Sequence, residues 1–214
     1  MQPVEVNSSM TSAPTISDLT TNRPKRVDAR RNYDKLIAAA REAFTEEGGS
    51  ASLEETARRA GVGIATLYRN FPTRQDLLEA VYVEEVEAVC RTAEELLGDP
   101  PWDALVAWLH RFLDYVATKQ ALSQELFSRL GRDSVVFTGC RTLFYAAGEK
   151  LLLRAQDAGV VRTDVGIDDV VMLVAGISKV PSASPEQIPR LLDIALEGLR
   201  PRAAGDDGHG AASG

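Results

Sequence analysis

Apolar residues recur at spacings of three and four along most of the chain, and polar, glycine-rich or proline-rich segments separate these periodic stretches. Such spacing places side chains on one face of an α-helix. The pattern therefore predicts an all-α protein of about nine helices. The expected helices span residues 28–47, 52–60, 64–71, 73–97, 102–118, 121–130, 134–158, 167–178 and 184–199.

Both ends of the chain lack this periodicity. Residues 1–22 are rich in Ser, Thr, Pro and Asn, and residues 202–214 contain many Gly and Ala. Segments of this kind bury too little apolar surface to offset the entropy lost on folding. We expect both to be disordered tails.

The stretch 52–74 has the features of two short helices joined by a tight turn. Ser52 and Glu55 have the spacing of a capping box at the start of the first helix. Gly61 follows the last periodic residue, where a left-handed residue usually ends a helix, and Gly63 gives a second permissive position. A proline ends the second helix because it lacks an N–H group. This is the arrangement of a helix-turn-helix, whose second helix enters the major groove of DNA.

The second helix of this unit has two chemically distinct faces. Leu67 and Phe71 lie four residues apart and predict a side that faces the core. The opposite side carries groups that suit phosphate oxygens and base edges. Its residues are Thr66, Tyr68, Arg69 and Asn70. The alternative interpretation is a surface helix hairpin, and for Tyr68 a ring that wedges against the core.

The run GVGIATLYRNFPTRQDLL resembles the DNA-binding signature of the TetR family of bacterial transcriptional regulators. Upstream, RRNYDKLIAAAREAFTEEG resembles the first helix of the same domain, so the resemblance extends over residues 29–83. The C-terminal part is similar to the branch typified by SbtR-type regulators. The resemblance implies a helix-turn-helix domain at residues 23–74 (the N-terminal domain) and a helical effector-binding and dimerisation domain at residues 75–201 (the C-terminal domain).

The family resemblance also implies a function. We expect a sequence-specific DNA-binding regulator, acting as a repressor, that leaves a palindromic operator when a small apolar or amphipathic ligand binds. Contacts with double-stranded DNA are expected from the first helix, the helix-turn-helix and the start of the fourth helix. The expected DNA-binding residues are Arg30, Arg31, Ser52, Gly63, Ile64, Ala65, Thr66, Tyr68, Arg69, Asn70 and Arg74.

Two positions depart from the family pattern. Gly63 stands in place of a usual serine, so the second helix of the unit is expected to lack a hydroxyl cap and one phosphate contact. Thr56 stands in place of a large aliphatic residue. Its methyl group can still pack in the core, and its hydroxyl can bond to a carbonyl one turn earlier.

Charge is distributed unevenly along the chain, whose net charge is −7. Residues 23–74 hold eleven basic and seven acidic side chains, which leaves about +4 there and about −11 in the remainder. A basic N-terminal domain and an acidic C-terminal domain would orient the molecule on DNA. The basic cluster Arg23-Pro-Lys-Arg could follow a phosphate backbone or the minor groove, or it could be a solvated charge run.

The last two predicted helices are the candidates for a homodimer interface, because their apolar faces are broader than one partner needs. Two DNA-binding domains must reach successive major grooves about 34 Å apart, which requires a dimer. The alternative interpretation is that these faces complete the core of the monomer.

Aromatic residues in the C-terminal domain are candidates to line an effector cavity between bundled helices. The expected ligand-binding residues are Trp108, Phe112, Tyr115, Phe127, Phe137, Cys140, Phe144 and Tyr145. The ligand itself is unknown. The alternative is that these aromatic side chains form a plain core, in a constitutive DNA-binding dimer with a fully packed, ligand-free C-terminal domain.

The sequence shows no motif for catalysis, metal binding or cofactor binding. The chain has no nucleophile elbow, phosphate-binding loop, metal-ligand spacing or dinucleotide fingerprint, and it has only two histidines, His110 and His209. We therefore expect no catalytic residue, metal or cofactor, and an all-α enzyme is the least favoured interpretation. Cys90 and Cys140 predict buried free thiols in a reducing cytosol. No apolar run reaches the roughly 18 residues of a membrane span, which favours a cytoplasmic protein.

Overall fold

The computed structural model describes residues 23–47, 51–130, 135–181, 183–184 and 186–201, with the backbone alone at 117–130 and 135. The predicted tails, 1–22 and 202–214, lie outside the described residues. Every regular element in the described residues is helical, which confirms the all-α prediction. The α-helices are α2 (Val27–Glu47), α3 (Leu53–Ala60), α4 (Ile64–Asn70), α5 (Arg74–Glu95), α6 (Pro101–Leu130), α7 (Val135–Asp157), α8 (Ile167–Ile177) and α9 (Gln187–Leu196), with short 3₁₀ turns at Leu96–Gly98 and Glu197–Leu199.

The predicted break between residues 118 and 121 is wrong. The structure has one helix, α6, where two were expected, so the described residues form eight α-helices rather than nine. The two intervening residues are Lys119 and Gln120, which are both good helix formers. Neither glycine nor proline is present there to interrupt the backbone hydrogen bonds, so the helix continues.

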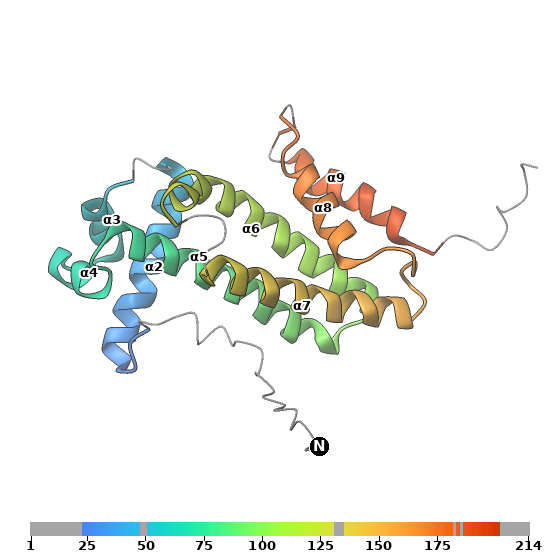
Figure 1. Cartoon of the computed structure of the whole chain (residues 1–214), viewed down its shortest axis with the longest axis horizontal. Coiled ribbons are helices and arrows are strands. Elements are labelled where there is room, and N and C mark those ends of the chain that lie inside the picture. The colour runs from blue at the N-terminus through green and yellow to red at the C-terminus, as the bar shows by residue number, and fades with distance from the viewer. Residues whose placement is uncertain (1–22, 48–50, 131–134, 182, 185, 202–214) are drawn as a thin grey trace, which may run out of the picture.

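The three N-terminal helices pack into a small domain at one end of the molecule (Figure 1). One face of α2 is apolar and buried, with Leu36 and Phe44 at most 1% exposed. Leu67 of α4 and Phe71 after it are also buried, and the Phe71 ring lies 5.1 Å from that of Tyr33 on α2. These contacts fix the position of α4 on the domain.

Helix α5 connects the N-terminal domain to the C-terminal domain. It starts with a complete capping box, in which Thr73 N donates to Asp76 Oδ2 (2.8 Å) and Asp76 N donates to Thr73 Oγ1 (3.2 Å). Its 22 residues correspond to about 33 Å of helix. It packs against α2 on one side and against α6 and α7 on the other.

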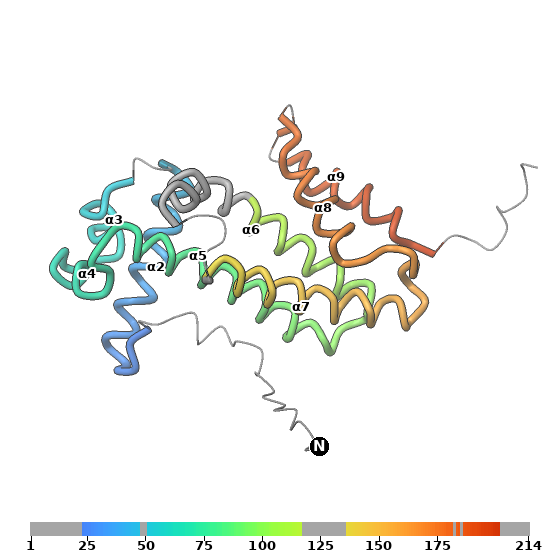
Figure 2. Tube along the Cα trace, viewed as in Figure 1, coloured from blue at the N-terminus to red at the C-terminus, as the bar shows by residue number. Residues whose placement is uncertain are grey.

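The C-terminal domain is a bundle of long helices with two shorter helices added at its far end. Figure 2 shows α5, α6 and α7 running along the long axis in alternating directions. Helices α8 and α9 pack on this bundle, mainly against α6, at the end away from α4 (Figure 1). No helix of the described chain is both long enough and apolar enough to cross a membrane.

Candidate nucleic-acid interface

The turn between α3 and α4 is built by short-range contacts that the sequence predicts. Ser52 Oγ accepts a hydrogen bond from Glu55 N (3.0 Å) and caps α3. Gly61 has φ +63° and ends α3 in the left-handed conformation. Thr56 is fully buried, and its Oγ1 donates to Ser52 O (2.9 Å), as expected for a threonine at this position. The turn that positions α4 is therefore confirmed.

One half of the predicted capping box on α3 is replaced by ion pairs. The Glu55 carboxylate accepts hydrogen bonds from Arg58 (2.6 and 2.7 Å) and Arg59 (2.9 Å). These hydrogen bonds lower the pKa of Glu55 to about 2. Arg59 also binds Glu46 (2.6 Å) and Glu47 (2.8 Å) at the end of α2. Arg59 thus holds α3 against α2, whereas Arg58 pairs only within α3. Neither arginine was predicted to contact DNA.

Helix α4 presents a continuous exposed face at the end of the molecule. Gly63, Ile64, Ala65, Tyr68 and Arg69 are exposed, with Tyr68 at 43%. The N-cap position has no side-chain hydrogen bond, as the glycine there predicts. The opposite face packs against the rest of the domain, because Leu67 is fully buried.

The polar residues of this face are hydrogen-bonded to one another within α4. Arg69 Nη2 donates to Thr66 Oγ1 (2.8 Å), and Asn70 Nδ2 donates to Thr66 O (2.8 Å). Both are contacts along one helix on the surface. The three side chains therefore form a short polar row with donors and acceptors of the kind that base edges and phosphates require.

The remaining predicted DNA-binding residues occupy two different environments. Arg30 and Arg31, in the first turns of α2, are exposed. Arg74, at the start of α5, lies over the ring of Phe44 (5.0 Å from the centroid) and donates to the carbonyl of Ala51. The guanidinium of Arg74 therefore stabilises the packing of the N-terminal domain in this conformation, and a phosphate contact by Arg74 stays a prediction.

Arg23, in the predicted basic arm, has a role that the sequence did not indicate. Its guanidinium forms ion pairs with Asp34 of α2 (3.4 Å) and with Glu84 (3.6 Å) and Glu87 (3.5 Å) of α5. Burial is the main cause that raises the pKa of Glu84, and the Arg23 charge acts in the opposite direction. Arg23 is therefore neither a solvated charge nor directed toward a nucleic acid here. Glu84 lies between core valines, and a carboxylate in such a run is the signal that could have suggested a buried ion pair.

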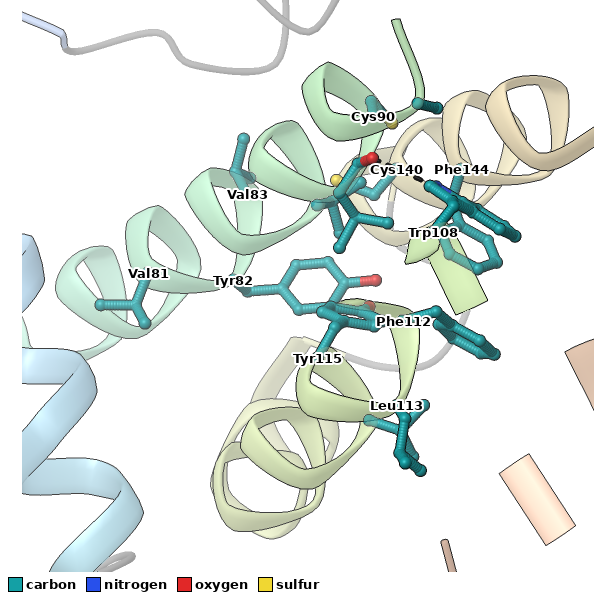
Figure 3. Packing of buried hydrophobic residues seen from close by; sticks show 14 of the residues in the cluster. Val81, Tyr82, Val83, Cys90, Trp108, Phe112, Leu113, Tyr115, Cys140 and Phe144 are labelled. Atoms are coloured by element: carbon teal, nitrogen blue, oxygen red, sulfur yellow. Dashed lines mark hydrogen bonds between the residues drawn. The ribbon is translucent and has the colours of Figure 1, made fainter. Parts of the chain in front are cut away.

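The predicted effector residues gather in one aromatic cluster between α5, α6 and α7 (Figure 3). The Phe144 ring lies 5.2 Å from the Trp108 ring, 4.7 Å from Phe112 and 6.1 Å from Tyr115. Members of the cluster are at most 6% exposed; they are Trp108, Phe112, Tyr115, Phe137, Cys140 and Phe144. Tyr145 lies at its edge, with its ring 5.6 Å from that of Phe144. The side chain of Phe127 lies outside the described residues.

Polar atoms are present inside this apolar cluster. Trp108 Nε1 donates to Val89 O on α5 (3.2 Å). Tyr82 of α5 forms a side-chain hydrogen bond with Tyr115 of α6. Burial raises the pKa of Tyr82 to about 12 and that of Tyr115 well above the ordinary tyrosine value. Nothing in the local sequence around Tyr82 indicates this partner on another helix, so sequence reasoning did not find it.

Two family descriptions match this chain. Residues 36–81 match the bacterial regulatory proteins of the tetR family, and residues 100–201 match the SbtR-like transcriptional regulator C-terminal domain. The crystal structure of the TetR transcriptional regulator SCO0520 from Streptomyces coelicolor is 42% identical, with a TM-score of 0.71 over 79% of this chain and 99% of that one. The chain belongs to the TetR family.

Two further relatives are also described as transcriptional regulators. The TetR transcription regulatory protein from Mycobacterium vanbaalenii is 30% identical, with a TM-score of 0.67 over 83% of this chain and 99% of that one. The HTH-type transcriptional regulator SAR0097 of Staphylococcus aureus is 30% identical in an alignment of 99 residues that covers 43% of this chain and 51% of that protein. The chain thus spans about half the length of this curated relative. All three similar proteins are described as regulators and none as an enzyme.

In this TetR-family regulator, α8 and α9 bury one side and leave apolar side chains on the other. Val170 and Val174 of α8 and Leu192 of α9 are buried. Met172 of α8 is 63% exposed and Ile194 of α9 is 66% exposed. One face of these helices therefore completes the monomer core, and a dimer through the exposed face stays a prediction.

Proposed function

We propose that this TetR-family regulator is a repressor that binds a palindromic operator as a homodimer and is released by a small apolar or amphipathic molecule. The observation that carries the proposal is the exposed polar face of α4, held at the end of a packed helix-turn-helix. A seven-residue helix that presents donors and acceptors outward is suited to the major groove.

The DNA contacts divide into two kinds. Thr66, Arg69 and Asn70 lie on the exposed face of α4 and are assigned to base edges. Arg30 and Arg31 are exposed on α2 and are assigned to phosphates, where they neutralise charge without sequence preference. The remaining predicted contacts, by Ser52, Gly63, Ile64, Ala65, Tyr68 and Arg74, would position the domain on the duplex.

The dimer is assigned to α8 and α9, whose exposed apolar side chains would be buried against the same helices of a second copy. Such an interface is isologous, since each copy contributes the same surface. It would form a four-helix bundle with the N-terminal domains at its outer ends.

The effector-binding site is assigned to the aromatic cluster. Tyr82 connects it directly to α5, the helix that begins four residues after α4 ends. A ligand that separates α6 or α7 from α5 would reorient α5 and with it the N-terminal domain. The hydroxyls of Tyr82 and Tyr115 can offer hydrogen bonds to a polar group of an otherwise apolar ligand, at the expense of their own bond.

A constitutive regulator is the second candidate, and the close contact of the rings favours it. Trp108 and Phe112 are stacked with an interplanar angle of 16° and are at most 4% exposed. A ligand could enter such a cluster only if the rings moved apart. In this case the C-terminal domain would serve only for dimerisation.

One experiment tests the regulator and separates the two candidates. The purified protein is used to select fragments from a random duplex library, and a palindromic consensus is the expected result. Metabolite fractions are then screened for compounds that release the selected DNA. Because coupling between sites is reciprocal, operator DNA must weaken ligand binding by the same factor. Selection of no consensus would reject the proposal, and a ligand that binds equally with and without operator would reject the release mechanism.

A further inference from the structure

A buried carboxylate of α5 connects the two domains. Glu85 is 3% exposed and lies where α5 passes between α2 and α6. One carboxylate oxygen, Oε1, forms an ion pair with Nε of Arg41 on α2. The other, Oε2, accepts a hydrogen bond from Nη2 of Arg111 on α6 (3.2 Å). Each oxygen therefore binds a guanidinium from a different domain.

The value of this bridge is geometric rather than energetic. Removing a carboxylate from water is costly, and paired arginines typically no more than offset that cost, so well-packed apolar side chains would stabilise the fold as well. A guanidinium, however, is a planar group that binds a carboxylate in a restricted orientation. The hydrogen bond from Arg111 orients the Glu85 carboxylate against α6, and the ion pair with Arg41 holds the same carboxylate to α2, so Glu85 links the two helices.

The two arginines lie next to the two functional regions. Arg111 directly precedes Phe112, a member of the aromatic cluster, and Arg41 lies on α2, the helix whose first turns carry the exposed Arg30 and Arg31. The Glu85 charge also acts on the neighbouring cluster residue Tyr115, where it adds to burial in raising the pKa of the phenol. The bridge is therefore placed between the proposed effector and DNA sites.

We propose that the Arg41–Glu85–Arg111 bridge positions the N-terminal domain on the C-terminal domain and thereby sets the half-site spacing that the dimer accepts. The inference rests on the proposed function. Arg74 precedes Glu85 by eleven residues, or about 17 Å along α5. Rotating each domain by about 6° at Glu85 would move each tip by about 1.7 Å, which changes the separation by about 3.4 Å, the rise of one base pair.

The test measures spacing preference rather than affinity alone. Duplexes carry the two half-sites selected by the wild-type protein, with the spacing changed by −2 to +2 base pairs, and a single half-site serves as reference. Binding is measured by fluorescence anisotropy at one salt concentration. We expect the wild type to lose about tenfold or more in affinity when the spacing changes by one base pair. Arg111→Met should reduce this loss to less than about threefold, with single half-site affinity unchanged.

Matched variants separate positioning from general destabilisation. Arg111→Met leaves Glu85 paired with Arg41, so the fold should persist, and Arg111→Lys should restore part of the spacing preference. Glu84→Gln is the control, because Glu84 is the neighbouring buried carboxylate but pairs with Arg23 rather than with α6. It should keep the wild-type profile.

The outcomes are distinguishable. If the wild type selects no paired half-sites, the proposed function fails before any variant is measured. If the wild type selects pairs and Arg111→Met keeps the same spacing profile, or loses affinity equally at every spacing, the positioning role is overturned while the proposed function stands. Should Arg111→Met prove unfolded by circular dichroism, Arg111→Gln, which removes the charge but keeps a polar side chain, takes its place, and a wild-type spacing profile in that variant would overturn the inference equally.

Discussion

Gly63 shows how a single missing side chain changes the start of a functional helix. It occupies the N-cap of α4 with ordinary negative φ (−62°), and a Cβ built there has no atom within 4 Å. The glycine is therefore not required by the backbone. Gly61, two residues earlier, has φ +63°, where a side chain is strained regardless of the space around it.

We expect Gly63→Ser to stabilise the protein and Gly61→Ser to destabilise it. The new hydroxyl can accept a hydrogen bond from a backbone N–H in the first turn of α4. This should raise the free energy of unfolding by about 0.3–0.5 kcal/mol relative to glycine. A serine at position 61 should cost about 1–2 kcal/mol because of its left-handed backbone. Urea unfolding followed by circular dichroism measures both, and shifts of the same sign in the two variants would contradict this account.

Arg69 is the side chain whose replacement should change sequence preference. Arg69→Ala should relax discrimination at one operator position by about 1–3 kcal/mol, since an arginine is the side chain that most often identifies a base. Arg58→Ala is the matched control, because Arg58 is also highly exposed but is bound to Glu55 on α3. Binding to a library of single-base operator variants at fixed salt measures the difference. An unchanged preference in Arg69→Ala would mean that another face of the domain contacts the bases.

Residues whose partners are near in sequence were predictable, and residues with distant partners were not. Thr56 bonds to a carbonyl four residues earlier, so its role follows from local geometry. Arg74 contacts Phe44 and Ala51, which are 30 and 23 residues earlier in the chain. Its position at the start of α5 indicates an exposed cation, and only the tertiary packing brings it over an aromatic ring.

At the scale of elements, α6 and α7 approach each other closely at Gly148. A Cβ built on Gly148 of α7 would lie 2.3 Å from Cη2 of Trp108 and 2.9 Å from Cδ1 of Ile167. The indole therefore rests directly on the backbone of α7. Periodicity predicted helical structure around both Trp108 and Gly148, but it cannot show which glycine permits a close approach, because that depends on the crossing point of two helices.

We expect Gly148→Ala to destabilise the protein by about 1–3 kcal/mol, because the new methyl group forces the indole or Ile167 to move. Helix propensity alone would predict the opposite sign, since alanine is favoured over glycine inside a helix. Gly198→Ala is the control, because no atom lies within 4 Å of a Cβ at that position. Thermal unfolding measures stability, and the fluorescence of Trp108 reports movement of the ring. A more stable Gly148→Ala variant would show that the cluster has room to adjust.

At the scale of the whole molecule, the sequence predicted the class and order of the helices better than the boundaries and contacts between them. The all-α architecture and the helix-turn-helix follow from periodicity, caps and glycine positions. The number of helices was overestimated because a break was expected between residues 118 and 121, whereas α6 continues through them. The bridge at Glu85 was not predictable, because it depends on three helices meeting, and the sequence shows only a carboxylate within an apolar run.

Exposed apolar side chains on α8 and α9 give the prediction that concerns the assembly. Ile194 is 66% exposed, while its neighbours on the other face of α9, Leu192 and Leu196, are buried in the monomer. Ile194→Glu should therefore leave the monomer folded but place two carboxylates in the proposed isologous interface, where like charges repel and lose hydration.

Sedimentation equilibrium should give a dimer for the wild type and a monomer, 23.2 kDa, for Ile194→Glu. The affinity of the variant for a duplex with two half-sites should fall to that for a single half-site, because the two domains no longer bind as one unit. Leu153→Glu on α7 is the control, since Leu153 is 50% exposed but lies outside α8 and α9. If Ile194→Glu remains dimeric, or if Leu153→Glu dissociates instead, the two copies associate through a different surface, and the separation of the two α4 helices must be set by that surface.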